Sequence, residues 1–314
     1  MICLGLAIAI SDAAAAEAES SSVALPGDAV YPESVTATSD GTFYVSSFAS
    51  GGVIRVRPGE AQGEIWIKPG AFGTRSTFGV LADERSNTLW VCSNDLSALG
   101  VPGPSDVPGS ALKAFDLKSG EGRLSIPLPT PALCNDIALA PDGTGYVTNT
   151  AAPQILRLKP GDHAFEVFAT DPRFGPNGKG AGLDGIAFGQ DGDLYVNTFS
   201  KAELFRVEVK DGAAGRITQL TPSRALKMAD GLRPAGDGSF LMAEGGGSLD
   251  RVTIVGDAAK IETLHDGIAG GATGVAKVGD TAWVTEGQLA YLLDPSKKGG
   301  TPPLPFRIFP VRLK

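Results

Sequence analysis

One unit recurs six times along this chain. It consists of a short apolar segment, a tight turn and a second segment with an aromatic or bulky apolar centre. The starts of successive copies lie 43 to 57 residues apart. Asp-Gly or a related pair between two apolar runs indicates a β-hairpin. The copies read ESVTATSDGTFYVSS from Glu33, FGVLADERSNTLWVCSN from Phe78, NDIALAPDGTGYVTNT from Asn135, DGIAFGQDGDLYVNTF from Asp184, DGLRPAGDGSFLMAEG from Asp230 and TGVAKVGDTAWVTEG from Thr273.

A third apolar segment follows each hairpin, and in most copies a Gly-containing turn leads to a fourth. In the last copy we expect the third strand at 287–294 and the fourth at 306–311, and segment 23–31 could join this copy and latch the ring. No segment has the pattern of a long amphipathic helix. Four strands repeated six times predict an all-β fold, a six-bladed β-propeller with four antiparallel strands per blade. Because each blade must bury its faces against its neighbours, we expect one domain over 23–314 rather than two separate three-blade domains.

The N-terminus has the pattern of an export signal. Residues 2–10 are apolar and small residues follow at 13–16, which resembles the end of a secretory signal peptide. Nine apolar residues are too few to span a bilayer. We therefore assign 1–22 to a signal peptide or disordered N-terminus and expect a periplasmic or secreted protein without a membrane span. The net charge of −8 argues against a nucleic-acid partner. We expect a monomer that acts on a small molecule.

The residues that open the six innermost strands should form a ring. In a propeller the first strand of each blade lines the central channel, so equivalent positions lie at one height around the axis. Four of the six carry an oxygen donor and three of these are carboxylates. In blade order the six are Glu33, Phe78, Asn135, Asp184, Asp230 and Thr273.

Three carboxylates that converge in a narrow channel repel one another. At an effective dielectric constant near 20, two like charges about 4 Å apart cost roughly 4 kcal/mol. Either some of them are protonated or a cation lies between them. Carboxylate and amide oxygens are the ligands that Ca²⁺ prefers, and the ring contains no His or Cys. We therefore expect one divalent cation, Ca²⁺ first and Zn²⁺, Mg²⁺ or Mn²⁺ as alternatives. An Asp or Asn before any single strand could equally be a turn former.

These motifs resemble the senescence marker protein/gluconolactonase family of six-bladed propellers, which includes regucalcin-like lactonases. The resemblance covers about 30–310, and its carriers are PESV at Glu33, CNDIALAPDG at Asn135, LDGIAFGQDG at Asp184 and ADGLRPAGDG at Asp230. It implies one divalent cation held by Glu33, Asn135, Asp184 and Asp230. The family usually has Asn at the position of Asp184, so this chain adds a negative charge there. The resemblance also implies that Asp136 acts in proton transfer, as a general base. Asp136 could instead be a strand cap or a partner of a ligand.

Further residues at the same end of the channel are candidates for substrate binding. Phe78 and Thr273 would form the channel wall, and Asn149, Asn197 and Glu244 end or nearly end second strands. The insertions 94–110 and 171–182 should also lie at this end, as lids or as surface loops. Cys92 and Cys134 could form a disulfide in an exported protein or remain buried thiols.

The resemblance and the ring together predict a divalent-metal-dependent hydrolase that opens a sugar lactone or a related cyclic ester. The alternative is a non-catalytic propeller that binds a small ligand or a protein at the channel mouth, because one propeller fold supports many functions. A third possibility is another reaction on this scaffold, such as organophosphate hydrolysis.

Overall fold

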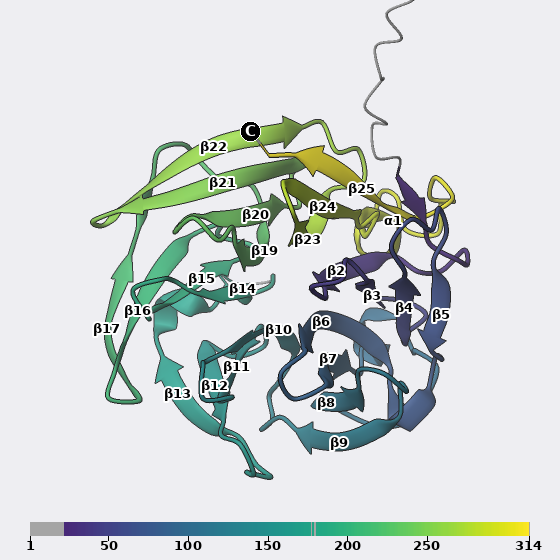
Figure 1. Ribbon diagram of the computed structural model, residues 1–314, viewed down its shortest axis with the longest axis horizontal. Helices are drawn as coiled ribbons and strands as arrows, with labels where there is room; N and C mark the ends of the chain where they lie inside the picture. Colours follow the sequence, from purple (N-terminus) through teal and green to yellow (C-terminus); the bar gives the residue numbers. More distant parts are fainter. Residues whose placement is uncertain (1–21, 177, 179, 314) are drawn as a thin grey trace, which may run out of the picture.

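Six sheets stand around a central axis in the computed structural model, which describes residues 22–313 except 177 and 179 (Figure 1). Five sheets have four strands and one has five. The predicted six-bladed propeller of four antiparallel strands per blade is therefore confirmed, with one short added strand. The predicted signal segment, 1–22, lies almost wholly outside the described residues. No helix in the described part of the chain is long and apolar enough to cross a membrane.

Each of the first four blades runs in chain order from the channel to the rim. Blade 1 contains β2 (Pro32–Ala37), β3 (Phe43–Ser47), β4 (Val53–Val56) and β5 (Glu64–Ile67). Blade 2 contains β6 (Ser76–Asp83), β7 (Thr88–Asn94), β8 (Ser110–Asp116) and β9 (Gly122–Pro127). Blade 3 contains β10 (Cys134–Leu139), β11 (Gly145–Asn149), β12 (Gln154–Leu158) and β13 (Glu166–Thr170). Blade 4 contains β14 (Leu183–Phe188), β15 (Leu194–Thr198), β16 (Leu204–Lys210) and β17 (Ala213–Gln219).

The last two blades depart from this pattern. In blade 5 a two-residue strand, β18, joins the outer strand in parallel. In blade 6 the outermost strand comes from the N-terminus, where Val23 pairs with Ile308. Blade 5 contains β19 (Ala229–Pro234), β20 (Phe240–Glu244), β21 (Ser248–Val255), β22 (Ala258–Asp266) and β18 (Thr221–Pro222). Blade 6 contains β23 (Ala272–Val278), β24 (Thr281–Glu286), β25 (Arg307–Arg312) and β1 (Val23–Ala24).

The sixth blade corrects one expectation. Segment 287–294 was expected to be its third strand, but it contains the short helix α1 (Ala290–Leu293), and β25 takes the third place. The fourth place is then free for β1, so the expected latch is confirmed although it is only two residues long. Ala, Leu and Leu within α1 are good helix formers. This arrangement closes the ring, because blade 6 takes its outermost strand, β1, from the N-terminal side of the chain and its other three strands from the C-terminal side.

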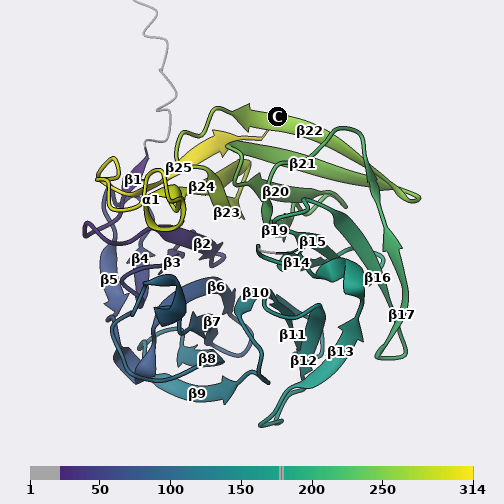
Figure 2. The same cartoon turned by 180° about the vertical axis from the view of Figure 1, so that it is seen from behind.

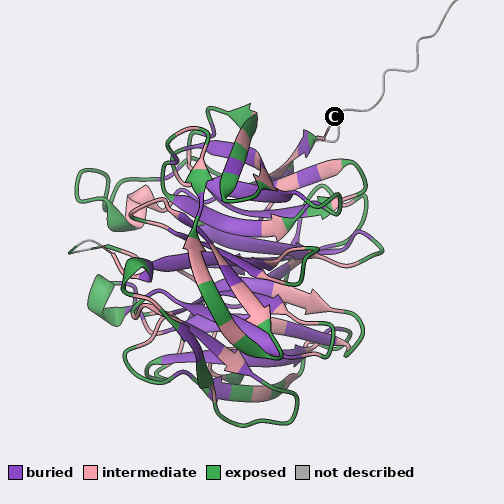
Figure 3. Cartoon of the chain, turned by 90° about the vertical axis from the view of Figure 1, so that its left-hand side faces the viewer, coloured by how far each residue is buried: buried purple, intermediate pink, exposed green. Residues whose placement is uncertain are grey.

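Aromatic side chains of the second strands fill the spaces between blades. Phe43 packs on Trp283 with ring centroids 4.9 Å apart, which joins blades 1 and 6. Tyr195 packs on Phe240 at 4.8 Å, which joins blades 4 and 5. Figure 3 shows the result from the side, with buried strands between exposed loops. The aromatic centre seen in each repeat is thus core packing.

All six innermost strands share one irregularity. Pairing with the second strand breaks at the same two residues in every blade, where the register shifts. The first of each pair is the predicted ring residue, so the six are structurally equivalent. In four blades the second is glycine, and a Cβ on Gly185 would lie only 2.5 Å from the carbonyl oxygen of Asp230. These glycines let neighbouring strands approach around the axis. The pairs are 33–34, 78–79, 135–136, 184–185, 230–231 and 273–274.

Candidate functional site

The four oxygen-bearing ring residues meet inside the channel. Glu33, Asn135, Asp184 and Asp230 are each only 5 to 6% exposed. The Nδ2 of Asn135 donates to Oδ2 of Asp184 at 3.2 Å, and the carboxyl groups of Asp184 and Asp230 lie close enough to act on one another. Glu33 lies close enough for the charges of Asp184 and Asp136 to act on it. Residues from four different blades therefore form one acidic cluster, named here the acidic ring.

Burial makes the acidic ring resist carrying full negative charge. Burial, followed by the nearby charge of Asp136, raises the pKa of Asp184 to about 7. Burial, followed by neighbouring carboxylates, also raises the pKa of Glu33 and of Asp230 well above their usual values. Such groups are stabilised either by protons or by a cation. The ring is thus an electrostatic site for positive charge.

Several oxygens of the acidic ring are free to act as ligands. Oε2 of Glu33 and Oδ1 of Asp184 are buried without a hydrogen-bond partner. Among the described residues, the hydrogen bonds of Asn135 leave its side chain through Nδ2, so its Oδ1 is also available. No three His, Cys, Asp or Glu side chains of the described residues are arranged closely enough to hold a metal ion without rearrangement. The donor set is nevertheless all oxygen and includes an amide, which fits a hard cation such as Ca²⁺.

A buried arginine forms the floor of the acidic ring. Arg233 of β19 reaches across the channel to Asp136 of β10, with Nη1 at 2.5 Å from Oδ2 and Nη2 at 2.8 Å from Oδ1. Nη2 also lies 3.4 Å from Oγ of Ser34 in blade 1. The two paired side chains are 12% and 4% exposed. This bidentate pair ties blades 3 and 5 together through the channel.

Sequence reasoning missed Arg233, although a signal was present. It lies three residues after Asp230, and the equivalent residues of the other blades are small or apolar, apart from one threonine. A cation at a channel-lining phase with three carboxylates nearby is a sign of a buried ion pair. The equivalent residues are Thr36, Leu81, Ala138, Ala187 and Ala276.

The surroundings of Asp136 bear on its predicted catalytic role. Besides the two bonds from Arg233, its carboxylate accepts from the backbone N–H of Ile137 at 2.9 Å and of Ile186 at 3.3 Å. Both oxygens are therefore occupied in this arrangement. Proton acceptance by Asp136 would require its bonds with Arg233 to loosen. Its role as general base stays a prediction, and the geometry assigns it at least the binding of Arg233.

Arg233 separates the acidic ring from an apolar cavity lower in the channel. This cavity measures about 250 Å³ and is lined mostly by apolar residues such as Ile137 and Ile186, together with Arg233, Asp83 and Arg85. On the opposite side, a larger cleft of about 460 Å³ opens beside Asp230 and Thr273. Its wall includes Phe199, Met228 and the segment 288–297 around α1, which Figure 2 shows in front of the blades. We name it the mouth cleft.

The other residues predicted to contact the substrate make contacts within the propeller in this structure. Phe78 stacks on Phe48 with centroids 4.8 Å apart. Asn149 bonds the backbone at Leu133 and Pro131, and Asn197 accepts from Gly185 N–H and donates to the carbonyl of Asp230. Thr273 lines the mouth cleft, while its hydroxyl contacts the carbonyl of Pro32 at 2.9 Å. As substrate contacts these four residues stay predictions.

The insertion 94–110 is held down by one arginine. Arg75, which is 7% exposed, contacts Oδ1 of Asp95 at 3.0 Å and Oγ of Ser97 at 2.7 Å. It also donates to the carbonyl oxygens of Pro102 and Val107. These four contacts tie the loop to the residue that precedes β6. Residues 177 and 179 of the other insertion lie outside the described part of the chain.

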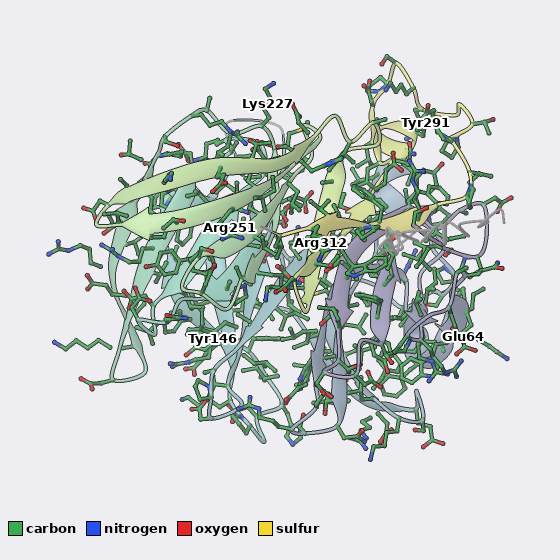
Figure 4. The ribbon with its side chains drawn as sticks, turned by 45° about the horizontal axis from the view of Figure 1, so that its top comes forward. Glu64, Tyr146, Lys227, Arg251, Tyr291 and Arg312 are labelled. Carbon is green, nitrogen blue, oxygen red and sulfur yellow. A yellow bond between two sulfur atoms is a disulfide. The ribbon has the colours of Figure 1, made fainter. Side chains whose placement is uncertain are left out.

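Glu244 belongs to a second buried carboxyl pair, beside the mouth cleft. Nη2 of Arg224 lies 2.6 Å from Oε1 of Glu244 and 2.6 Å from Oδ1 of Asp250. Burial, followed by the hydrogen bond with Glu244, raises the pKa of Asp250 to about 7. Burial also opposes ionisation of Glu244, but hydrogen bonds from Asp250 and Arg224 leave its pKa lowered. The two groups therefore share one proton near neutral pH. Figure 4 labels Lys227, whose backbone N–H donates to Oε2 of Glu244.

This pair predicts a pH-dependent stability. Because the pKa of Asp250 is raised in the folded state, its contribution is complete below pH 4 and is lost as the pH rises toward about 7. Urea unfolding of the wild type and of Asp250→Asn between pH 4.5 and 7.5 measures this. We expect the stability of the wild type relative to the variant to fall over that interval. A difference that does not change with pH would contradict the shared proton.

A disulfide lies directly behind Asn135. Cys92 of β7 and Cys134 of β10 are bonded, with Cα atoms 5.2 Å apart, and join blades 2 and 3. The side chain of Asn94 is hydrogen-bonded to the same strand: it accepts from the N–H of Cys134 and donates to the carbonyl oxygen of Cys134. The sequence left this pairing open, and the structure resolves it in favour of the bond.

Comparison with known proteins supports the fold. No protein-family model matches the chain, and no curated protein matches it. Among solved structures, a gluconolactonase from Xanthomonas campestris shares 16% identity and a TM-score of 0.66, over 91% of this chain and 87% of that one. Regucalcin from Agrobacterium tumefaciens, described as a calcium-binding protein, shares 17% identity and a TM-score of 0.63, over 93% and 97%. The predicted resemblance is thus confirmed at the level of the fold.

A third similar structure shows that this fold does not determine the reaction that a protein catalyses. The PQQ-bound aldose sugar dehydrogenase from Streptomyces coelicolor shares 17% identity and a TM-score of 0.60, over 93% of this chain and 98% of that one. Propellers of this shape therefore include both lactonases and oxidoreductases. The function must be argued from the site.

Proposed function

We propose that this protein is a divalent-cation-dependent hydrolase that opens a cyclic ester, a lactonase-like enzyme. The observation that carries the proposal is the acidic ring, with its unpartnered buried oxygens on Glu33 and Asp184, beside a cleft that is open to a small molecule. A gluconolactonase and a calcium-binding regucalcin share this fold, so the fold is compatible with this chemistry.

Each residue of the proposed site would have a distinct role. Glu33, Asn135, Asp184 and Asp230 would hold the cation, Ca²⁺ in the first place. When bound, the cation supplies Lewis-acid polarisation of a carbonyl oxygen. The mouth cleft would bind the ester beside Asp230, and the wall below the ring, closed by Arg233, would keep the substrate at this end. Asp136 would handle the proton if Arg233 releases one of its oxygens.

A non-catalytic propeller that binds a ligand at the mouth remains the second candidate. The occupied oxygens of Asp136 favour it, because a general base needs a free lone pair. We also propose export to the periplasm or the exterior, for which the Cys92–Cys134 bond is the supporting feature, since disulfides persist in oxidising compartments.

Hydrolysis assays after metal removal test the enzymatic proposal. The protein is freed of metal with a chelator, and release of acid from a panel of lactones is followed with Ca²⁺, Mg²⁺, Mn²⁺ or Zn²⁺ added back. We expect activity to return with a divalent cation and to fall at least roughly 100-fold in Asp136→Asn, the range expected for a lost acid–base group. Cation binding without turnover of any lactone would instead support the non-catalytic candidate.

A further inference from the structure

The mouth cleft has a composition that bears on the substrate. It measures about 460 Å³, within the range of roughly 300–1,000 Å³ typical of small-molecule sites. Four segments form it: the end of blade 4 at Phe199, the edge of blade 5 at Met228 and Gly245, the segment 269–273 at the start of blade 6, and the segment 288–297. Because Asp230 also lines it, a molecule bound here lies against the acidic ring.

Apolar side chains form one part of the lining of the mouth cleft, and the polar side chains of Asp230, Thr273, Gln288, Tyr291, Asp294 and Lys297 form the rest. Met228 and Leu293 line it and are 42% and 41% exposed, an unusual degree for such residues. Phe199 and Leu289 add further apolar surface, and the glycines of the wall add no polar side chains. The apolar part of the lining offers no hydrogen bonds to the hydroxyl groups of a polyhydroxylated ring, and unpaired polar groups are costly to bury.

One of the polar side chains of the cleft, that of Gln288, is buried beside this apolar surface. Gln288 lines the cleft, is 5% exposed, and its side-chain amide bonds to no described residue. It lies against Gly270, where a Cβ would come within 2.8 Å of its Cδ. A buried amide without a partner, next to apolar surface, suits a ligand that has a polar group beside an apolar substituent.

The backbone at two of these positions is held in an uncommon conformation. Met228 has φ 56° and Gln288 has φ 58°, in the left-handed region that bulky residues rarely adopt. Residues held in sparsely populated conformations concentrate at ligand-binding sites, because the surrounding structure must stabilise them. This observation is independent of the apolar composition, and it selects the same two segments of the cleft wall.

We propose that the substrate is a cyclic ester that carries an apolar substituent, rather than a polyhydroxylated sugar lactone. This inference rests on the proposed function. The substituent lies between Met228 and Leu293, the ester group faces Asp230, and Gln288 binds its polar end. Met228 and Leu293 are then the residues that determine specificity.

A chain-length series tests the proposal. The kcat/KM is measured for δ-lactones that carry alkyl side chains of one, three and five carbons, and for δ-gluconolactone. Each buried methylene should raise kcat/KM by about fourfold. We expect the five-carbon lactone to be the best of the series and to exceed δ-gluconolactone by at least tenfold. Equal or faster hydrolysis of δ-gluconolactone would overturn the inference and leave the proposed function standing.

Two variants of the cleft and one control locate the effect. Met228→Asn removes apolar surface and introduces a residue that tolerates the left-handed region. Leu293→Gln removes apolar surface from α1. Both variants should reduce the increase of kcat/KM with alkyl chain length. Val255→Gln, at the 69% exposed end of β21 outside the cleft, should leave it unchanged. Equal slopes in all variants would contradict the assignment of these residues.

Binding of lactams separates the inference from the proposed function. Lactams with the same alkyl chains are not esters, so their affinity can be measured by calorimetry whether or not the protein has activity. If no lactone is hydrolysed, the proposed function fails. The apolar site is still supported if lactam affinity rises with chain length, and is overturned if it does not.

Discussion

Arg233→Met is expected to lower the free energy of unfolding by about 3–5 kcal/mol, the cost of leaving one partner of a buried ion pair without the other. The variant keeps the length and apolar stem of the side chain but removes both bonds to Asp136. Asp136, 3% exposed, would then be a buried carboxylate next to three others. Urea unfolding at neutral pH, followed by intrinsic fluorescence, measures the loss.

A double-mutant cycle separates the ion pair from other effects of substitution. Asp136→Asn keeps an acceptor for the N–H of Ile137 and removes the charge, and Arg233→Met with Asp136→Asn removes both charges. The double variant should be more stable than the sum of the two single losses implies. Strictly additive losses would contradict direct coupling between Arg233 and Asp136.

Removal of the Cys92–Cys134 bond is expected to cost about 4 kcal/mol, because it closes a loop between residues 42 apart in sequence. The double variant Cys92→Ser/Cys134→Ser measures this by urea unfolding. The fold around Asn135 should survive, since Asn94 still holds the strand through two hydrogen bonds. Wild type unfolded in reducing buffer serves as a control, and its free energy of unfolding should equal that of the variant. A thiol count on the denatured, unreduced protein that finds both cysteines reactive would contradict the bond.

The propeller could be predicted because its signal is repeated. Each blade carries its own hairpin turn and aromatic strand, so an ambiguous copy is supported by the other five. Blade 6 was harder because its outer strands pair Val23 with Ile308, at opposite ends of the chain. Local patterns carry no information on such a pairing, and the apolar run that became α1 also satisfies a strand pattern.

The acidic ring could be predicted for the same reason, since its members share one phase of the repeat. Arg233 could not be found in that way, because it has no counterpart in the other blades and its partner lies 97 residues away. The mouth cleft was also beyond sequence reasoning. Its walls come from the rim of three blades, and the left-handed backbone at Met228 and Gln288 follows from tertiary packing.

Titration calorimetry with Ca²⁺ tests the central claim most directly, that the acidic ring is a cation site. Chelator-treated wild type should bind one Ca²⁺ per chain. Asp230→Asn, which preserves the shape of the side chain, should bind it at least roughly tenfold more weakly, since it loses one ligand charge. Asp237→Asn changes a turn residue outside the ring, on the loop between β19 and β20, and should match the wild type. Absence of binding by the wild type, or equal binding by Asp230→Asn, would contradict the account.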